Sequence, residues 1–70
     1  MYKRLKELRT ENNYSQSQIA DLLHIKQNTY SQYETGKRQP SVELLAKIAK
    51  IFSVSVDYIL ELTDSEDPYP

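Results

Sequence analysis

Two short helix patterns, over residues 16–23 and 27–35, follow each other with only three residues between them. The first begins after Ser15, which forms a Ser-x-x-Gln capping box with Gln18, and this motif marks the start of a helix. In both patterns apolar residues recur at helical spacing and are expected to face inward: Ile19, Leu22, Leu23, Tyr30 and Tyr33. Because the turn is so short, the two helices must pack against each other, and the rest of the chain serves to support them.

The second of these helices carries an unusual set of polar residues. They occur at i, i+1, i+4 and i+5 and therefore share one face: Gln27, Asn28, Ser31 and Gln32. An exposed helix is often polar merely because it is exposed, but Glu and Lys are the usual residues there. Gln and Asn donate and accept together, which suits the paired donor and acceptor of adenine in the DNA major groove, and Ser suits several base edges. The residues therefore predict a helix-turn-helix whose second helix reads DNA bases.

The same region resembles a known family. The segments SQSQIADLLHIKQNTYSQYETGKRQPS and LLAKIAKIFSVSVDYIL resemble the phage repressor (Cro/C1-type) helix-turn-helix family, also called the xenobiotic-response-element family, over roughly residues 5–62. The resemblance is specific because its motifs combine at fixed spacings: the Gln16 start, Ala20, Tyr33-Glu34-x-Gly36-Lys37, Pro40-Ser41 and Val54-Ser55-x-Asp57-Tyr58. It implies an all-α fold, a five-helix lambda-repressor-like DNA-binding domain.

The resemblance also implies roles for individual residues. Base reading is implied for Gln27, Asn28 and Gln32, with Ser31 assisting. Contacts with the DNA backbone are expected for Gln16, Lys26, Thr29, Lys37 and Arg38; Lys26 also suits a guanine edge, and Thr29 a thymine methyl group. An arginine at the position of Arg9 commonly pairs in the family with the glutamate that closes the recognition helix, so an ion pair with Glu34 is expected. Lys26 stands where the family often has Ser or Thr, which predicts a weaker helix cap.

Three further helices are expected around this pair. One covers residues 2–12, another runs from the cap Ser41 to Phe52, and a short last helix is capped by Ser55. The last helix is more apolar than one covered side requires, so some of its residues are candidates for pairing with a second copy: Val56, Ile59, Leu60 and Leu62. Residues 63–70 are acidic and contain proline, and we expect a frayed tail there, beyond a domain of residues 1–62.

Charge is divided unevenly along the 70 residues, whose net charge is −1. Residues 1–56 hold all nine Lys and Arg against five acids, a net +4, whereas residues 57–70 hold five acids and no base, a net −5. A modest positive field near residues 26–38 is therefore expected. Without cysteine, without an apolar leader after Met1 and without a long apolar run, the chain is expected to be a cytoplasmic protein with no membrane span.

Catalysis and metal binding find little support among the residues. His24 is the one histidine; it stands where the family usually has glycine, and His tolerates the left-handed region, so we interpret it as a turn residue. Asp57 and Glu61 are four residues apart but have no nucleophile beside them, and we interpret them as a solvated acidic face. No catalytic residue, metal or cofactor is expected.

The sequence therefore predicts a sequence-specific DNA-binding transcriptional regulator, most simply a repressor, that binds double-stranded DNA as a homodimer. Two recognition helices about 34 Å apart enter successive major grooves, so the operator is expected to be two-fold symmetric. An alternative is the antitoxin of a toxin–antitoxin pair, whose main partner is a protein, the toxin. Its apolar last helix and its tail would then order on that partner.

Overall fold

The computed structural model describes residues 3–64, and within that range the chain forms five helices and no strand. They are α1 (Lys3–Glu11), α2 (Gln16–Leu23), α3 (Gln27–Thr35), α4 (Val42–Phe52) and α5 (Val56–Ile59). The expected all-α fold is confirmed. Residues 1–2 of the first predicted helix and residues 65–70 of the predicted tail lie outside the described range.

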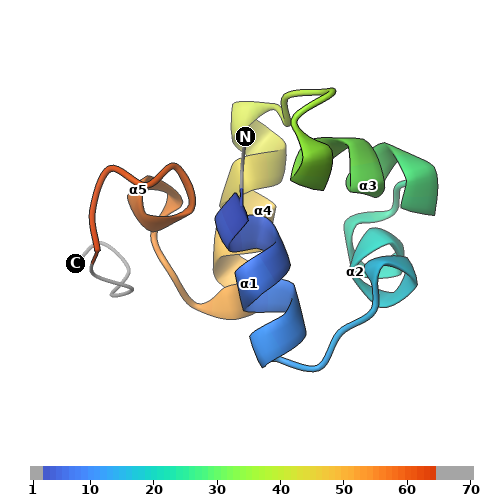
Figure 1. Ribbon diagram of the computed structural model, residues 1–70, viewed down its shortest axis with the longest axis horizontal. Coiled ribbons are helices and arrows are strands. Elements are labelled where there is room, and N and C mark those ends of the chain that lie inside the picture. Colours follow the sequence, from blue (N-terminus) through green and yellow to red (C-terminus); the bar gives the residue numbers. More distant parts are fainter. Residues whose placement is uncertain (1–2, 65–70) are drawn as a thin grey trace.

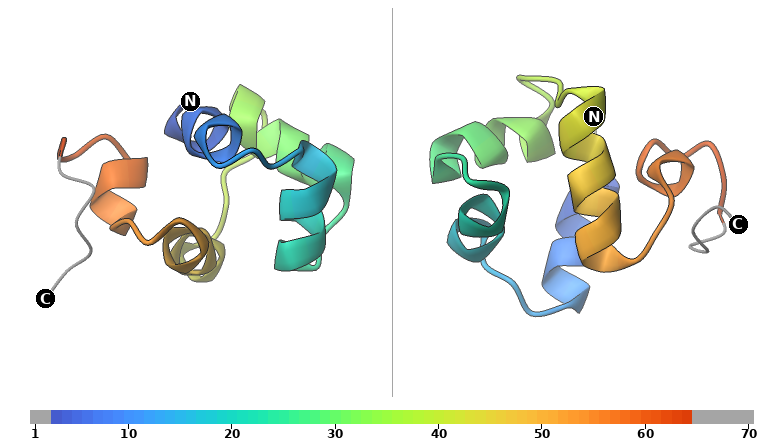
Figure 2. Two further views of the ribbon diagram at one scale, coloured as in Figure 1. Left: turned by 90° about the horizontal axis from the view of Figure 1, so that it is seen from below. Right: turned by 180° about the vertical axis from the view of Figure 1, so that it is seen from behind.

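The helices are arranged along the longest axis of the molecule (Figure 1). The α2–α3 pair lies at one end and α5 at the other, while α1 and α4 lie between them on opposite sides of the core (Figure 2). Helix α1 contacts both α3 and α5, and α4 contacts α2 and α5. Helix α1 therefore connects the two ends. In residues 3–64 no helix has the length and apolar character needed to cross a membrane.

Serine caps begin three of the helices. At α2 the Gln18 backbone N–H donates to Ser15 Oγ at 3.1 Å, and the Ser15 N–H donates to Gln18 Oε1 at 2.8 Å, so the capping box is complete. Ser41 and Ser55 begin α4 and α5 and accept the backbone N–H three residues later at 3.1 and 3.0 Å. Each such cap contributes about 1 kcal/mol, which is substantial for helices this short.

Left-handed residues end the helices or follow their ends. They are Asn13 (φ 61°), His24 (58°), Gly36 (83°), Ser53 (56°) and Glu61 (62°). The left-handed conformation expected at His24 is confirmed, whereas the sequence analysis did not indicate one at Ser53 or Glu61. Helix α1 ends at Glu11, one residue before the predicted end, because the chain turns at Asn13.

The core contains one apolar cluster built from all five helices. Its buried members are Leu5, Leu8, Ile19, Ala20, Leu23, Tyr30, Tyr33, Leu45, Ile48, Ala49, Val54 and Ile59. The inward phase expected of Tyr30 and Tyr33 is confirmed. The expectation for Leu22 is wrong, because half of this residue is exposed. At about 100° per residue, Ile19, Leu23 and Ala20 lie on one arc of α2, and Leu22 falls beyond its edge.

The last helix is less available to a partner than its composition indicates. Ile59 has no exposed surface, so its assignment as a dimer-interface residue is wrong. Helix α5 contacts both α1 and α4, and Ile59 closes the core at that end. Val56 and Leu60 are half-buried, whereas Leu62 is 72% exposed.

A contact that the sequence did not predict connects Arg4 of α1 to the C-terminal segment. Arg4 Nη1 donates to the backbone oxygens of Tyr58 at 2.8 Å and Thr63 at 2.6 Å, and Nη2 donates to Asp64 Oδ1 at 3.0 Å. The guanidinium carbon also lies 4.2 Å from the centre of the Tyr58 ring. We call these contacts the Arg4 clasp. The prediction of a frayed tail is therefore wrong for Thr63 and Asp64, because both are held against α1.

The acids of residues 57–64 lie at one end of the molecule, beside Lys3 and Arg4 of α1. Asp57, Glu61 and Asp64 lie in or after α5, at the end of the molecule opposite α3 (Figure 1). Lys3 Nζ lies 3.7 Å from Glu61 Oε1, which partly neutralises that acidic end. These three acids thus lie far from the predicted recognition helix.

Candidate nucleic-acid interface

The turn between α2 and α3 is compact because His24 adopts the left-handed conformation there. The Ile25 backbone N–H donates to the Ala20 carbonyl at 3.0 Å, which reverses the chain within three residues. Lys26 then caps α3 with extended backbone but without a side-chain hydrogen bond, so the weak cap expected from the sequence is confirmed. The two helices are consequently packed directly against each other.

The outward side of α3 presents side chains without partners. Gln27 and Asn28 are exposed, and Ser31 and Gln32 are half-buried. Among the described residues, none of these four side chains forms a hydrogen bond with the protein. Their donors and acceptors are therefore open to an external ligand, which is the condition that base reading requires.

Three of these four residues share a hollow with the start of α2. Gln16, Gln27, Asn28 and Ser31 line an open depression of about 420 Å³. Gln32 does not line this hollow, although helical spacing puts it on the same side of α3 as the other three. Of the predicted backbone contacts, Lys26, Lys37 and Arg38 are exposed and Thr29 is half-buried.

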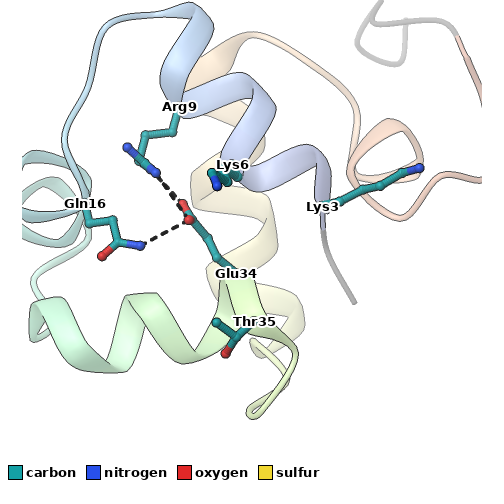
Figure 3. A pocket seen from close by; sticks show the side chains of 6 residues that line it. All are labelled: Lys3, Lys6, Arg9, Gln16, Glu34 and Thr35. Carbon is teal, nitrogen blue, oxygen red and sulfur yellow. Dashed lines mark hydrogen bonds and ion pairs between the residues drawn. The ribbon is translucent and has the colours of Figure 1, made fainter.

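Three helices meet at the carboxylate of Glu34. Arg9 from α1 donates from Nε to Glu34 Oε2 at 2.7 Å and from Nη2 to Oε1 at 3.3 Å. Gln16 from α2 donates from Nε2 to the same Oε1 at 3.2 Å, and both side chains point at the carboxylate in Figure 3. The Arg9–Glu34 ion pair is the one that the family resemblance implies. The link to Gln16, 18 residues away in the chain, has no counterpart in the sequence pattern.

This network perturbs the protonation of its members. Burial acts to raise the pKa of Glu34, but Arg9 and then the neighbouring Tyr30 and Gln16 outweigh it, so the pKa of Glu34 lies below its ordinary value. The hydrogen bond with Glu34 raises the pKa of Arg9. Burial, and then the Glu34 carboxylate, raises the pKa of Tyr30; the hydroxyl of this residue is buried without a well-formed hydrogen bond among residues 3–64. The site therefore holds a charged Arg9–Glu34 pair at neutral pH.

Gln16 differs from its predicted position in one respect. One N–H of its side-chain amide donates to Glu34, so one of the two amide donors is already engaged. Gln16 is also the first residue of α2, and the first N–H groups of a helix have no partner within the helix and bind anions. A phosphate contact at Gln16 stays a prediction.

Two helices joined by a three-residue turn, the second with an open amide-bearing face, make up a helix-turn-helix domain. A family model described as helix-turn-helix matches residues 5–59. The chain belongs to this family, in its phage repressor (Cro/C1-type) form.

The chain is also similar to several regulators. It is 41% identical over 63 residues to the SPbeta prophage-derived uncharacterized HTH-type transcriptional regulator YonR of Bacillus subtilis (strain 168), covering 90% of this chain and 58% of that protein. It is 32% identical over 63 residues to the cryptic phage CTXphi transcriptional repressor RstR of Vibrio cholerae, covering 90% and 55%. It is 40% identical over 57 residues to the HTH-type transcriptional activator BcrR of Enterococcus faecalis, covering 81% and 28%. The chain thus spans at most 58% of the length of these three relatives.

Proposed function

We propose that the chain is a sequence-specific DNA-binding transcriptional regulator and that α3 is its recognition helix. The observation that carries the proposal is the face of α3, where Gln27, Asn28 and Ser31 border an open hollow and their side chains form no hydrogen bond within residues 3–64. A buried Tyr30 and the Arg9–Glu34 pair hold this helix in place from behind. The relatives YonR and RstR, which are named as transcriptional regulators, support the same function.

The proposed contacts divide into two kinds. Base reading is assigned to Gln27, Asn28, Ser31 and Gln32, whose amides and hydroxyl match base edges. Backbone contacts are assigned to Gln16 through its main chain and to Lys26, Thr29, Lys37 and Arg38 through their side chains. Asp57, Glu61 and Asp64 lie in or after α5, at the end of the molecule opposite α3, so they oppose DNA binding only weakly.

The finer proposal is a homodimer on a two-fold-symmetric operator, with repression by occupation of a promoter. A monomer presents one recognition helix, whereas two helices about 34 Å apart read two half-sites. With Ile59 buried, the remaining candidate interface residues are Val56, Leu60 and Leu62, of which Leu62 is the most exposed. The relatives include one protein named a repressor and one named an activator, so the direction of regulation needs its own measurement. Repression is the simplest choice, because occupation of a promoter is sufficient for it.

Selection of bound sequences from a random duplex pool, at a stated salt concentration, tests the function. We expect the enriched sequences to contain two copies of one half-site, related by two-fold symmetry. Gln27→Ala or Gln32→Ala should each cost about 1–3 kcal/mol on that site and relax the preference at one base pair. Lys37→Ala should instead weaken all sequences alike. An enriched site that is unchanged by both Gln substitutions would contradict the assigned roles.

Sedimentation velocity with and without the selected duplex tests the assembly. Leu62→Glu should weaken the dimer and the cooperative binding of two half-sites, because it places a charge in the proposed interface. Val42→Glu is the matched control, since Val42 is 79% exposed at the start of α4. A chain that remains a monomer on DNA would overturn the homodimer, and a stable complex with a second protein would favour the antitoxin alternative.

A further inference from the structure

A second hollow lies on the other side of Gln16, between α1 and the C-terminal end of α3. It measures about 500 Å³ and is lined by Lys3, Lys6, Arg9, Gln16, Glu34 and Thr35 (Figure 3). Because Gln16 also lines the hollow with Gln27, Asn28 and Ser31, the two depressions are adjacent. A ligand that covers the α3 face therefore extends naturally onto α1.

The charges in this hollow do not cancel. Arg9 and Glu34 neutralise each other through two hydrogen bonds, of 2.7 and 3.3 Å. Lys3 extends away from that pair toward the acidic C-terminal segment, where Glu61 lies 3.7 Å away (Figure 3). Lys6 is exposed and has no ion pair among residues 3–64. One positive charge therefore remains over the hollow, at Lys6.

The groups around Lys6 suit a phosphate group as a ligand. The start of α2 offers the backbone N–H of Gln16, whereas the hydroxyl of Thr35 at the end of α3 already donates to the Gln32 carbonyl at 3.2 Å. Main-chain N–H groups and lysines commonly contact DNA phosphates. A lysine on a surface helix is usually just solvated, and Lys47 on α4, which lines neither hollow, is an example in the same chain.

We propose that Lys6 binds a phosphate of the DNA backbone, so that α1 forms a second backbone anchor beside the recognition helix. This inference rests on the proposed function, because it places the phosphate next to bases read by α3. Lys6 then adds affinity and salt dependence but no sequence preference. Arg9 acts as a positioning residue in this site, since its charge cancels that of Glu34 and leaves the hollow open to an anion.

The test compares Lys6→Gln with Lys47→Gln, which remove the same charge from two exposed lysines. Binding to the selected duplex is measured from 50 to 200 mM salt, and thermal melts verify that both variants remain folded. One lost phosphate contact reduces the slope of log K against log salt by about 0.9 per subunit, which is roughly a three-fold change in affinity over that salt range for each subunit. We expect this loss for Lys6→Gln with an unchanged selected sequence, and no change of slope for Lys47→Gln.

The outcomes separate the two proposals. Equal slopes for Lys6→Gln and the unaltered protein, or equal losses in both variants, would overturn the anchor while the proposed function stands. A changed selected sequence for Lys6→Gln would also overturn it, since a phosphate contact carries no sequence information. An unaltered protein that binds no duplex in preference to competitor DNA would overturn the proposed function, and the anchor with it.

Discussion

Two arginines near opposite ends of α1 are held by different kinds of acceptor. Arg9 meets a buried carboxylate, Glu34, at 2.7 Å, and both side chains are nearly inaccessible to solvent. Arg4 meets two backbone carbonyls and the exposed carboxylate of Asp64. One contact fixes the recognition helix, and the other fixes the C-terminal segment.

The two arginines differ in which groups lose their hydrogen-bond donor when the arginine is removed. Without Arg9, the Glu34 carboxylate stays in the interior and keeps the hydrogen bond from Gln16 but loses the cation that pairs with it. Without Arg4, the carbonyls of Tyr58 and Thr63 are close enough to the surface for water to replace it. A buried pair is therefore expensive to break, whereas a clasp on the main chain is cheaper to lose.

The largest effect is expected for Arg9→Met. The unpaired charge of Glu34 should lower the free energy of unfolding by about 3–5 kcal/mol, measured by urea denaturation at pH 7. Adding Glu34→Gln to the same chain removes that charge and should recover most of the loss. A single variant within about 1 kcal/mol of the unaltered protein would mean that the pair is not effectively buried.

A smaller loss is expected for Arg4→Met. Hydrogen bonds from a charged group are worth about 1.5–3 kcal/mol, and hydration of the released carbonyls should keep the total near the lower end. The measurement is again the urea midpoint, with Lys3→Met as the control, because the Lys3 side chain is 70% exposed and its ion pair is weak. A loss as large as that of Arg9→Met would remove the distinction between the two arginines.

Acid should affect the two regions differently. The pKa of Glu34 is lowered in the folded protein, so its contribution to stability is full above the ordinary glutamate pKa and is lost as the pH falls through the lower folded value. Unfolding midpoints from pH 7 down to pH 2 should therefore fall less steeply in Glu34→Gln. Arg4→Met should retain the acid dependence of the unaltered protein, and a flattened curve in Arg4→Met would contradict this assignment.

The smallest effect is expected for Asp64→Asn. The Asp64 side chain is fully exposed, so its ion pair with Arg4 is screened by solvent. We expect an unchanged urea midpoint and an unchanged salt dependence of stability. A measurable loss would show that the carboxylate, and not the two carbonyls, carries the Arg4 clasp.

Local features of the fold were predictable because their causes are local. The serine caps, the left-handed turn at His24 and the inward phase of Tyr30 each depend on residues within about one turn of helix. Ile59 was misassigned for the opposite reason. Its apolar character is visible in the sequence, but whether α1 and α4 or a second copy covers it depends on distant parts of the chain.

The candidate site shows the same division. The α3 face follows from helical spacing, so Gln27, Asn28, Ser31 and Gln32 were expected on one side, and three of them border one hollow. The Arg9–Glu34 pair was expected only through the family resemblance. The Gln16 link and the second hollow at Lys6 were not expected, since they depend on how three helices meet.

The sequence by itself determined where each helix begins, which faces are apolar and which helix carries the amides, because these properties repeat over one or two turns. Only the tertiary structure decided that Arg4 binds Tyr58 and Thr63, which follow it by 54 and 59 positions in the chain. It also decided that Ile59 belongs to the core of its own chain. Such contacts form between elements that are far apart along the chain and pack together only in the folded protein. A local pattern in the sequence does not indicate which distant elements pack together.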